Sequence, residues 1–288
     1  MTSRRRSCRW STGENGDELM LQVATIERTK EAIRIAVCNF LIIAFILACG
    51  MHAWAGPPFV TDDPEPVEFS HWEVYISSIT ARDPSQSSGT LPHVEVNYGP
   101  APNLQVHMIL PYAFNRPAGE STARGLGDTE LGVKYRFVQE TRRRPMVGIF
   151  PLVEVPSGNA THGLGSGHFQ YFLPIWVQKS WGPWTSYGGG GYFINPGMGN
   201  RSFWLYGWEV QKDLDEHLTL GGEVFGTTPD SEGAPNDFNF NIGGFYNLDE
   251  EHHILFSAGR GIRGNIELMS YIGFQWTFGP LEPKASTQ

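Results

Sequence analysis

The sequence predicts an all-β protein: a transmembrane, antiparallel, up-and-down β-barrel of about twelve strands that follows a cleaved signal peptide. Three observations predict this fold class. Glycine contributes 34 of the 288 residues and aromatic residues 13%, whereas charged residues contribute only 18%. Segments in which apolar and polar residues alternate recur along the chain. After the amino-terminal region no apolar run approaches roughly 18 residues, so any membrane crossing must use strands.

The composition also excludes several classes of protein. The aromatic content is too high, and the charge too low, for an intrinsically disordered chain. Ala, Glu, Lys and Leu do not dominate, which excludes a coiled coil. The formal net charge is -9 and no large basic patch stands out, so we expect no nucleic-acid partner.

The first element is an amino-terminal extension with a signal peptide, expected over residues 1–55. Arg34 precedes an apolar run over 35–51, and the small residues of Ala53-Trp54-Ala55 follow it. A charge, about ten strongly apolar residues and an A-x-A pattern are typical of a secretory signal. We therefore expect cleavage after Ala55, which leaves Gly56 as the new amino end.

Two alternatives to this cleavage remain open. Cys49 ends a lipoprotein-like box, so lipidation at that cysteine is the weaker alternative. A transmembrane helix is disfavoured because the apolar core is short and Asn39 interrupts it. The start codon is Met1 or Met20. After cleavage the chain holds 14 Lys and Arg against 25 Asp and Glu, a net charge of -11, and no cysteine.

The strands follow from period-two alternation, which is clearest over Ile266–Phe278. Its apolar side chains fall on one face and its polar ones on the other over thirteen residues. A membrane-spanning strand needs about 9–11 residues, more than a typical strand of a soluble sandwich. The same criterion predicts twelve strands, over 71–82, 92–98, 103–113, 127–139, 146–156, 168–180, 184–195, 201–213, 217–228, 237–248, 252–262 and 266–278.

The connections between these strands alternate between tight turns and longer loops. Transmembrane barrels show this pattern, with short periplasmic turns and longer outer loops. The longer loops are expected at 83–91, 114–126, 157–167 and 229–236. The barrel is expected over 71–278, between a periplasmic amino-terminal segment, 56–70, and a carboxy-terminal tail, 279–288.

Alternation also predicts which side chains face the lumen. Seven of them are acids and two are permanent bases, so we expect an acidic interior in which Lys134 and Arg136 neutralise Glu130 or Glu154. An alternative is that paired charges plug a narrow barrel. A barrel of about eight strands is filled by side chains and one of about sixteen strands is open, and twelve strands lie between these sizes. The candidate lumen-lining residues are Glu73, His93, Glu95, His107, Glu130, Lys134, Arg136, Glu154, Glu209, Glu223 and Glu267.

One strand carries a family resemblance. Residues 125–137, GLGDTELGVKYRF, resemble a strand of the outer-membrane transporter family named after the meta-pathway of phenol degradation. Residues 151–158, PLVEVPSG, followed by GLG at 163–165, resemble its next hairpin, and 56–64, GPPFVTDDP, resemble its mature amino end. The chain departs from many barrels in extending beyond Phe278, the aromatic residue on which such a chain often ends.

The resemblance implies an outer-membrane barrel that moves small organic molecules and has no catalytic residues. We expect passive passage of small solutes, with aromatic or cationic ones as candidates. The runner-up is a structural or surface-binding barrel with a plugged lumen, and a barrel hydrolase comes third. The expected partners are outer-membrane lipid, lipopolysaccharide, the barrel assembly machinery and the solutes.

No motif in the sequence indicates catalysis, a metal or a cofactor. Ser166 and His168 are the nearest approach to a nucleophile beside a base, but they lie two apart in a predicted loop. No H-E-x-x-H pattern occurs, and His252-His253 would point to opposite faces of a strand. The glycines at 163–167 precede a strand rather than the helix that a phosphate loop requires. We therefore expect no enzyme activity, no metal and no cofactor.

Overall fold

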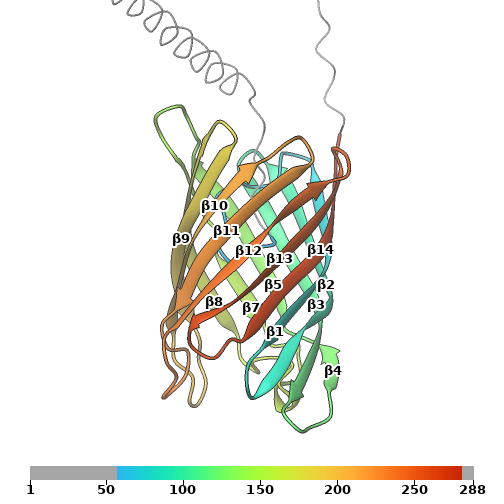
Figure 1. The fold of residues 1–288 in the computed structure, drawn as a ribbon, viewed down its shortest axis with the longest axis vertical. Helices are drawn as coiled ribbons and strands as arrows, with labels where there is room; N and C mark the ends of the chain where they lie inside the picture. The colour runs from blue at the N-terminus through green and yellow to red at the C-terminus, as the bar shows by residue number, and fades with distance from the viewer. Residues whose placement is uncertain (1–56, 281–288) are drawn as a thin grey trace, which may run out of the picture. The chain divides into compact units, whose positions relative to one another are not determined.

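The computed structural model describes residues 57–280, which form a closed antiparallel β-barrel (Figure 1). Ala53, Ala55, Gly56, Cys49 and the predicted signal peptide lie outside the described residues. The strands are β1 (Trp72–Arg82), β2 (Gln86–Ala101), β3 (Leu104–Pro117), β4 (Ala123–Leu126), β5 (Thr129–Val138), β6 (Met146–Ile149), β7 (Leu152–Val155), β8 (Gln170–Trp181), β9 (Trp184–Ile194), β10 (Phe203–Asp213), β11 (Leu218–Thr227), β12 (Asp237–Asn247), β13 (His252–Arg263) and β14 (Leu268–Phe278).

These segments make a wall of twelve strands, which confirms the predicted fold class. Both β4 and β5 pair with β3, and both β6 and β7 pair with β8, so each of these couples acts as one interrupted wall strand. The first and last strands close the barrel, from Trp72 opposite Phe278 to Arg82 opposite Leu268. Closure pairs the wall strands on both sides, apart from the short β4 at the loop end, which pairs only with β3.

The connections define two ends of the barrel. The turn end, at which β1 begins and β14 ends, holds the connections 102–103, 139–145, 182–183, 214–217 and 248–251. The loop end holds the connections 83–85, 118–122, 156–169, 195–202, 228–236 and 264–267. Figure 1 shows the turn end at the top. The tight turns are therefore gathered at one end, although 83–85 at the loop end is also short.

Two of the predicted loops are largely strand. β2 begins at Gln86 and pairs with β3 as far as Pro117, whereas the sequence predicted a loop over 83–91. β4 lies within the predicted loop 114–126. Residues 86–90 are Gln, Ser, Ser, Gly and Thr, which show no apolar alternation, but backbone pairing does not require it. The predicted strand 146–156 is interrupted at Phe150 and Pro151, since proline has no N–H for the ladder.

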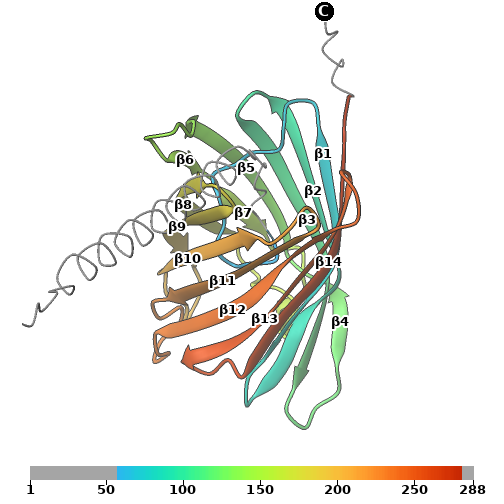
Figure 2. The same cartoon turned by 45° about the horizontal axis from the view of Figure 1, so that its top comes forward.

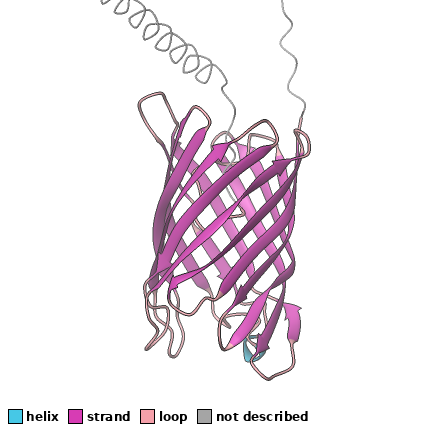
Figure 3. Cartoon of the chain, viewed as in Figure 1, coloured by secondary structure: helices cyan, strands magenta, loops and turns pink. Residues whose placement is uncertain are grey.

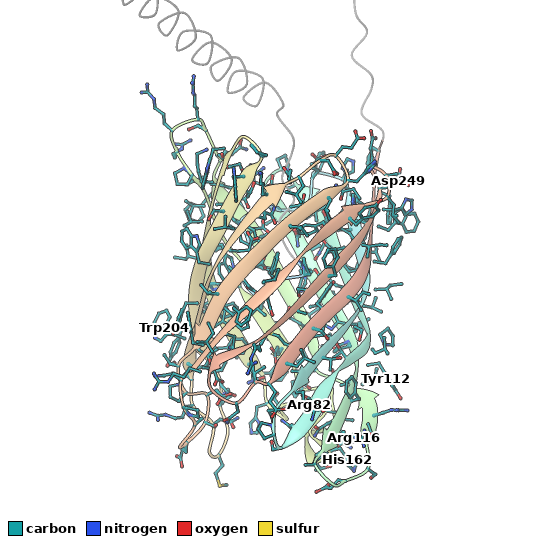
Figure 4. All side chains as sticks on the ribbon, viewed as in Figure 1. Arg82, Tyr112, Arg116, His162, Trp204 and Asp249 are labelled. Carbon is teal, nitrogen blue, oxygen red and sulfur yellow. The ribbon has the colours of Figure 1, made fainter. Side chains whose placement is uncertain are left out.

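The two faces of the wall differ sharply in polarity. Large apolar side chains are exposed on the outer face; Ile272, for example, is 62% exposed. The inner face buries polar side chains such as Gln211, Asn239 and Gln275. An apolar outer band around a polar interior is the arrangement of transmembrane β-barrels. Figure 4 shows the side chains that stand out from the wall.

The only helical element of residues 57–280 is one 3-10 turn, Ala160–His162, at the loop end (Figure 3). In this part of the chain no helix is long and apolar enough to cross a membrane.

Candidate functional site

The lumen contains the segment that precedes β1, residues 57–70, which we call the plug segment. Figure 2 shows this segment, in blue, inside the ring of strands. Strand β11 holds its backbone, because the N–H groups of Val60 and Thr61 donate to the Glu223 carboxylate at 2.9 and 2.7 Å. The Ser257 hydroxyl donates to the Pro58 carbonyl at 2.7 Å. The structure thus places these residues within the barrel, whereas the sequence suggested a separate periplasmic segment.

The two permanent lumen cations bind the plug segment. The Lys134 ammonium lies 2.9 Å from Asp62 and 3.5 Å from Asp63, and Arg136 lies 3.4 Å from Glu65. The suggested neutralisation of Glu130 or Glu154 by these cations is therefore not what the structure shows. Burial raises the pKa of the Asp63 carboxyl well above its usual range, and the Lys134 charge offsets only part of this effect.

Glycines in the wall make room for the plug segment. A Cβ atom at Gly207 would collide with the Thr61 hydroxyl, and one at Gly148 would press on Pro64. Residues at these two positions face the lumen, so a side chain there would occupy the space that the segment fills. These glycines therefore permit the close approach of a second backbone.

Two cavities lie inside the barrel, and the first of them adjoins the plug segment. The first, of 420 Å³, reaches the turn end and is lined by carboxylates, including Glu73 and Glu95, and by aromatic rings, including Tyr75, Phe150 and Phe245. The second, of 390 Å³, lies toward the loop end. It is lined by Thr90, His93, Ile109, Pro111, Ala113, Gly127, Asp128, Glu130, Glu154, Gly163, Leu164, Gly165, Ser166 and Gln170.

His107 connects the linings of these cavities. Its Nδ1 lies 2.7 Å from the Asn97 amide oxygen, and its Nε2 lies 3.0 Å from Glu130. The Asn97 amide nitrogen donates to Glu95 at 2.8 Å, which turns the amide oxygen toward the imidazole. Both ring nitrogens thus face acceptors, an arrangement that suits a doubly protonated imidazolium. A continuous polar chain from Glu95 to Glu130 therefore lines the wall between the cavities.

The predicted lumen residues occupy several different environments. Glu73 and Glu95 line the first cavity, whereas His93, Glu130 and Glu154 line the second, and His107 lies between them. Lys134, Arg136 and Glu223 hold the plug segment. Glu209 is fully buried.

Glu267 is the exception among the predicted lumen residues. It precedes β14 in the β13–β14 connection, where it is exposed and forms an ion pair with Arg82 at 3.4 Å. The sequence predicted a lumen position for Glu267 because the predicted strand began at 266. β14 begins only at Leu268, so the alternation between the two faces does not apply to Glu267. The sequence reading missed the acids of the plug segment, although the resemblance at 56–64 had singled out that stretch.

The Ser166 and His168 pair does not form a nucleophile and base. The His168 ring nitrogen Nδ1 lies 3.1 Å from the backbone carbonyl of Ser166, not from its hydroxyl. The Ser166 hydroxyl instead lies 2.8 Å from Asp128, whose carboxylate also accepts the N–H of Gly158. These contacts anchor the loop 156–169 on the barrel wall. Among residues 57–280 no cluster of three or more potential metal ligands occurs.

Comparison with solved structures finds barrels of the outer-membrane channel type. An outer-membrane channel from Pseudomonas putida F1 has a TM-score of 0.66 at 12% identity, covering 78% of this chain and 100% of that one. The KdgM porin has a TM-score of 0.51 at 12% identity, covering 71% of this chain and 99% of its own. The NanC porin has a TM-score of 0.50 at 9% identity, covering 70% and 98%. No protein-family model and no curated protein sequence matches the chain. At these identities the similarity establishes the fold.

Proposed function

We propose that this protein is an outer-membrane channel for passive passage of small solutes, with a preference for organic cations. The observation that carries the proposal is the pair of carboxylate-lined cavities inside the barrel, joined along the wall by the Glu95–Asn97–His107–Glu130 chain. Carboxylate rings favour cations in pores. The similar barrels named above, two of them called porins and one a channel, support the same class of function.

The location is tested first. We expect the protein to fractionate with the outer membrane and to migrate faster on a denaturing gel before boiling than after it, because a closed barrel resists detergent. Recovery in the soluble periplasm would contradict the proposal.

The aromatic part of the solute preference rests on the first cavity. Tyr75, Phe150 and Phe245 line it together with Glu73 and Glu95, so it offers apolar rings beside negative charge. A ring that carries an ammonium group fits both features. The resemblance of residues 125–137 to a strand of the phenol meta-pathway transporter family supports membership of that family.

Liposome swelling distinguishes these solutes. After the rate into protein-free liposomes is subtracted, because neutral solutes also cross the lipid itself, we expect benzylamine to enter proteoliposomes faster than benzyl alcohol, which has the same ring without the charge. Equal rates, or faster entry of the neutral compound, would contradict the cation preference while leaving passage itself intact.

Conductance with matched variants tests the role of the carboxylates. Replacing Glu73 and Glu95 by Gln keeps their size but removes two charges from the first cavity, so the reversal potential in a salt gradient should move toward anion permeability. Glu267→Gln makes the same chemical change in an exposed connection and should leave it unmoved. A wild-type channel selective for anions would contradict the proposal.

A structural barrel with a plugged lumen is the second candidate function. The contacts of the plug segment with Lys134, Arg136 and Glu223 favour it, because they hold that segment across the interior. Planar-bilayer recordings with residues 57–70 present and removed separate the two candidates. Current through the intact chain supports a channel, whereas current only after the deletion supports a plug.

A further inference from the structure

A row of arginines lies on the outer surface at the loop end. Arg82 on β1 is directly opposite Ser87 on β2, and Ser87 is directly opposite Arg116 on β3. Adjacent strands are about 4.8 Å apart, so the backbones of the two arginines are about 10 Å apart in one row. Arg124 on β4 is opposite Phe114, the outward-facing residue two positions before Arg116. Three guanidinium groups thus share one face of neighbouring strands.

These side chains point away from the lumen. The side chain of Arg82 is 64% exposed and forms an ion pair with Glu267. Arg116 and Arg124 are exposed, and neither has an ion-pair partner among residues 57–280. Figure 4 shows Arg82 and Arg116 near the loop end. At least two of the three positive charges are therefore free to bind an external anion.

An apolar surface borders this row on the side of the membrane. Leu126 and Tyr112, which are directly opposite each other on β4 and β3, are 66% and 43% exposed. Leu268, opposite Arg82 on β14, is 50% exposed. A ligand that spans the row and this surface would need phosphate groups next to hydrocarbon.

We propose that Arg82, Arg116 and Arg124 form a binding site for the phosphorylated sugar headgroup of lipopolysaccharide, with its acyl chains on Tyr112, Leu126 and Leu268. Arginine binds phosphate through two parallel hydrogen bonds, which gives both strength and orientation. The loop end faces the outer leaflet, where this lipid lies, because tight turns mark the periplasmic end of such barrels. The inference requires the barrel to be in the outer membrane but is independent of what passes through the lumen.

The arginines at the opposite end of the barrel provide a control. Arg142, Arg143 and Arg144 lie in the 139–145 connection at the turn end, not on a wall strand. They carry the same charge but lie together in a turn, not on one face of paired wall strands. Neutralising two of them changes the net charge of the protein by the same amount as neutralising Arg116 and Arg124.

Native mass spectrometry of the detergent-solubilised, folded barrel tests the site with lipid A as the probe. We expect Arg116→Gln with Arg124→Gln to weaken lipid A binding by about tenfold or more, since two charge-assisted contacts are lost. Arg142→Gln with Arg143→Gln should bind as the unmodified protein does. Lipid A stripped of its phosphates should bind the unmodified protein about as weakly as lipid A binds the first variant. Faster migration before boiling checks that each variant is folded.

Several results would overturn the proposal. They are unchanged binding by the Arg116 and Arg124 variant, equal weakening by the control variant, and equal binding of the lipid without phosphates. Displacement of lipid A by excess inorganic phosphate would show a site for a free anion instead. None of these results depends on conductance, so failure here is distinct from failure of the channel proposal.

Discussion

Glu209 and Glu223 lie directly opposite each other on β10 and β11, both with buried side chains, but their surroundings differ. The Glu223 carboxylate accepts hydrogen bonds from the N–H groups of Val60 and Thr61 and from the Asn241 amide at 2.6 Å. Neither carboxylate oxygen of Glu209 has a hydrogen-bond partner among residues 57–280. These two glutamates face each other on neighbouring strands, but only Glu223 anchors the plug segment through hydrogen bonds.

Replacing each of these glutamates by Gln should test this difference. Glu209→Gln should change the free energy of unfolding by less than about 1 kcal/mol, because the Glu209 carboxyl has no hydrogen bond within residues 57–280 to lose. Glu223→Gln should lower it by about 1–3 kcal/mol, because charge-assisted hydrogen bonds to the plug segment are weakened. Urea-induced unfolding from lipid vesicles measures both. Equal losses from the two replacements would contradict this difference.

A side chain at Gly207 should displace the plug segment. In Gly207→Val the new atoms would occupy the position of the Thr61 hydroxyl, so we expect larger single-channel conductance and faster proteolysis within 57–70. Gly222→Ala on the neighbouring strand β11 is the control, since a Cβ there approaches only the Asn241 carbonyl, at 3.4 Å. Unchanged conductance in the Gly207 variant would show that the segment does not limit the path.

Asp63 should make the seating of the plug segment depend on pH. Because burial raises the pKa of Asp63, this carboxyl binds a proton more tightly in the seated state than in a released, solvated one. The proton on Asp63 therefore stabilises the seated state of the plug segment. This stabilisation is fully present below the pKa of about 3.9 in the released state, and it is lost as the pH rises through the raised pKa of the seated state. Acidification should seat the segment and lower the conductance.

Comparison with Asp63→Asn isolates this contribution, because the other acids of the plug segment remain in both proteins. Conductance recorded between pH 8 and pH 5 should fall more on acidification in the unmodified protein than in the variant. Identical pH profiles would assign the dependence to other groups.

The outer face of β14 should tolerate charge far less than its inner face. Phe274 lies near the middle of the strand, opposite Ile76 and Ile254, and Phe274→Arg should cost about 2–4 kcal/mol near the bilayer midplane. Gln275→Arg is the matched control, because Gln275 lines the first cavity beside Glu73 and Glu95. Unfolding from vesicles measures both costs. Equal values would mean that the two faces do not meet lipid and lumen.

Local alternation of apolar and polar residues is enough to predict most of the strands, the twelve-stranded wall and the polarity of its two faces. In 266–278 the apolar residues of the outer face recur at every second position except at Ser270, so local alternation fixes which side chains meet lipid. The same alternation brings Glu73, Glu95 and Glu130 to the inner face without knowledge of their neighbours. Where alternation is absent, as at 86–90, the strand was missed, because only pairing with a distant strand reveals it.

The content of the lumen depends on contacts between residues far apart in the chain. Residues 57–70 contain Pro57, Pro58, Pro64 and Pro66 and have no periodicity, so their conformation depends on partners far away in the chain. Thr61 and Glu223 are 162 positions apart, and Asp62 and Lys134 are 72 apart. Barrel closure brings these groups together, and no local pattern encodes such contacts. For the same reason the ion pair of Arg82 with Glu267 appears only once β1 and β14 meet.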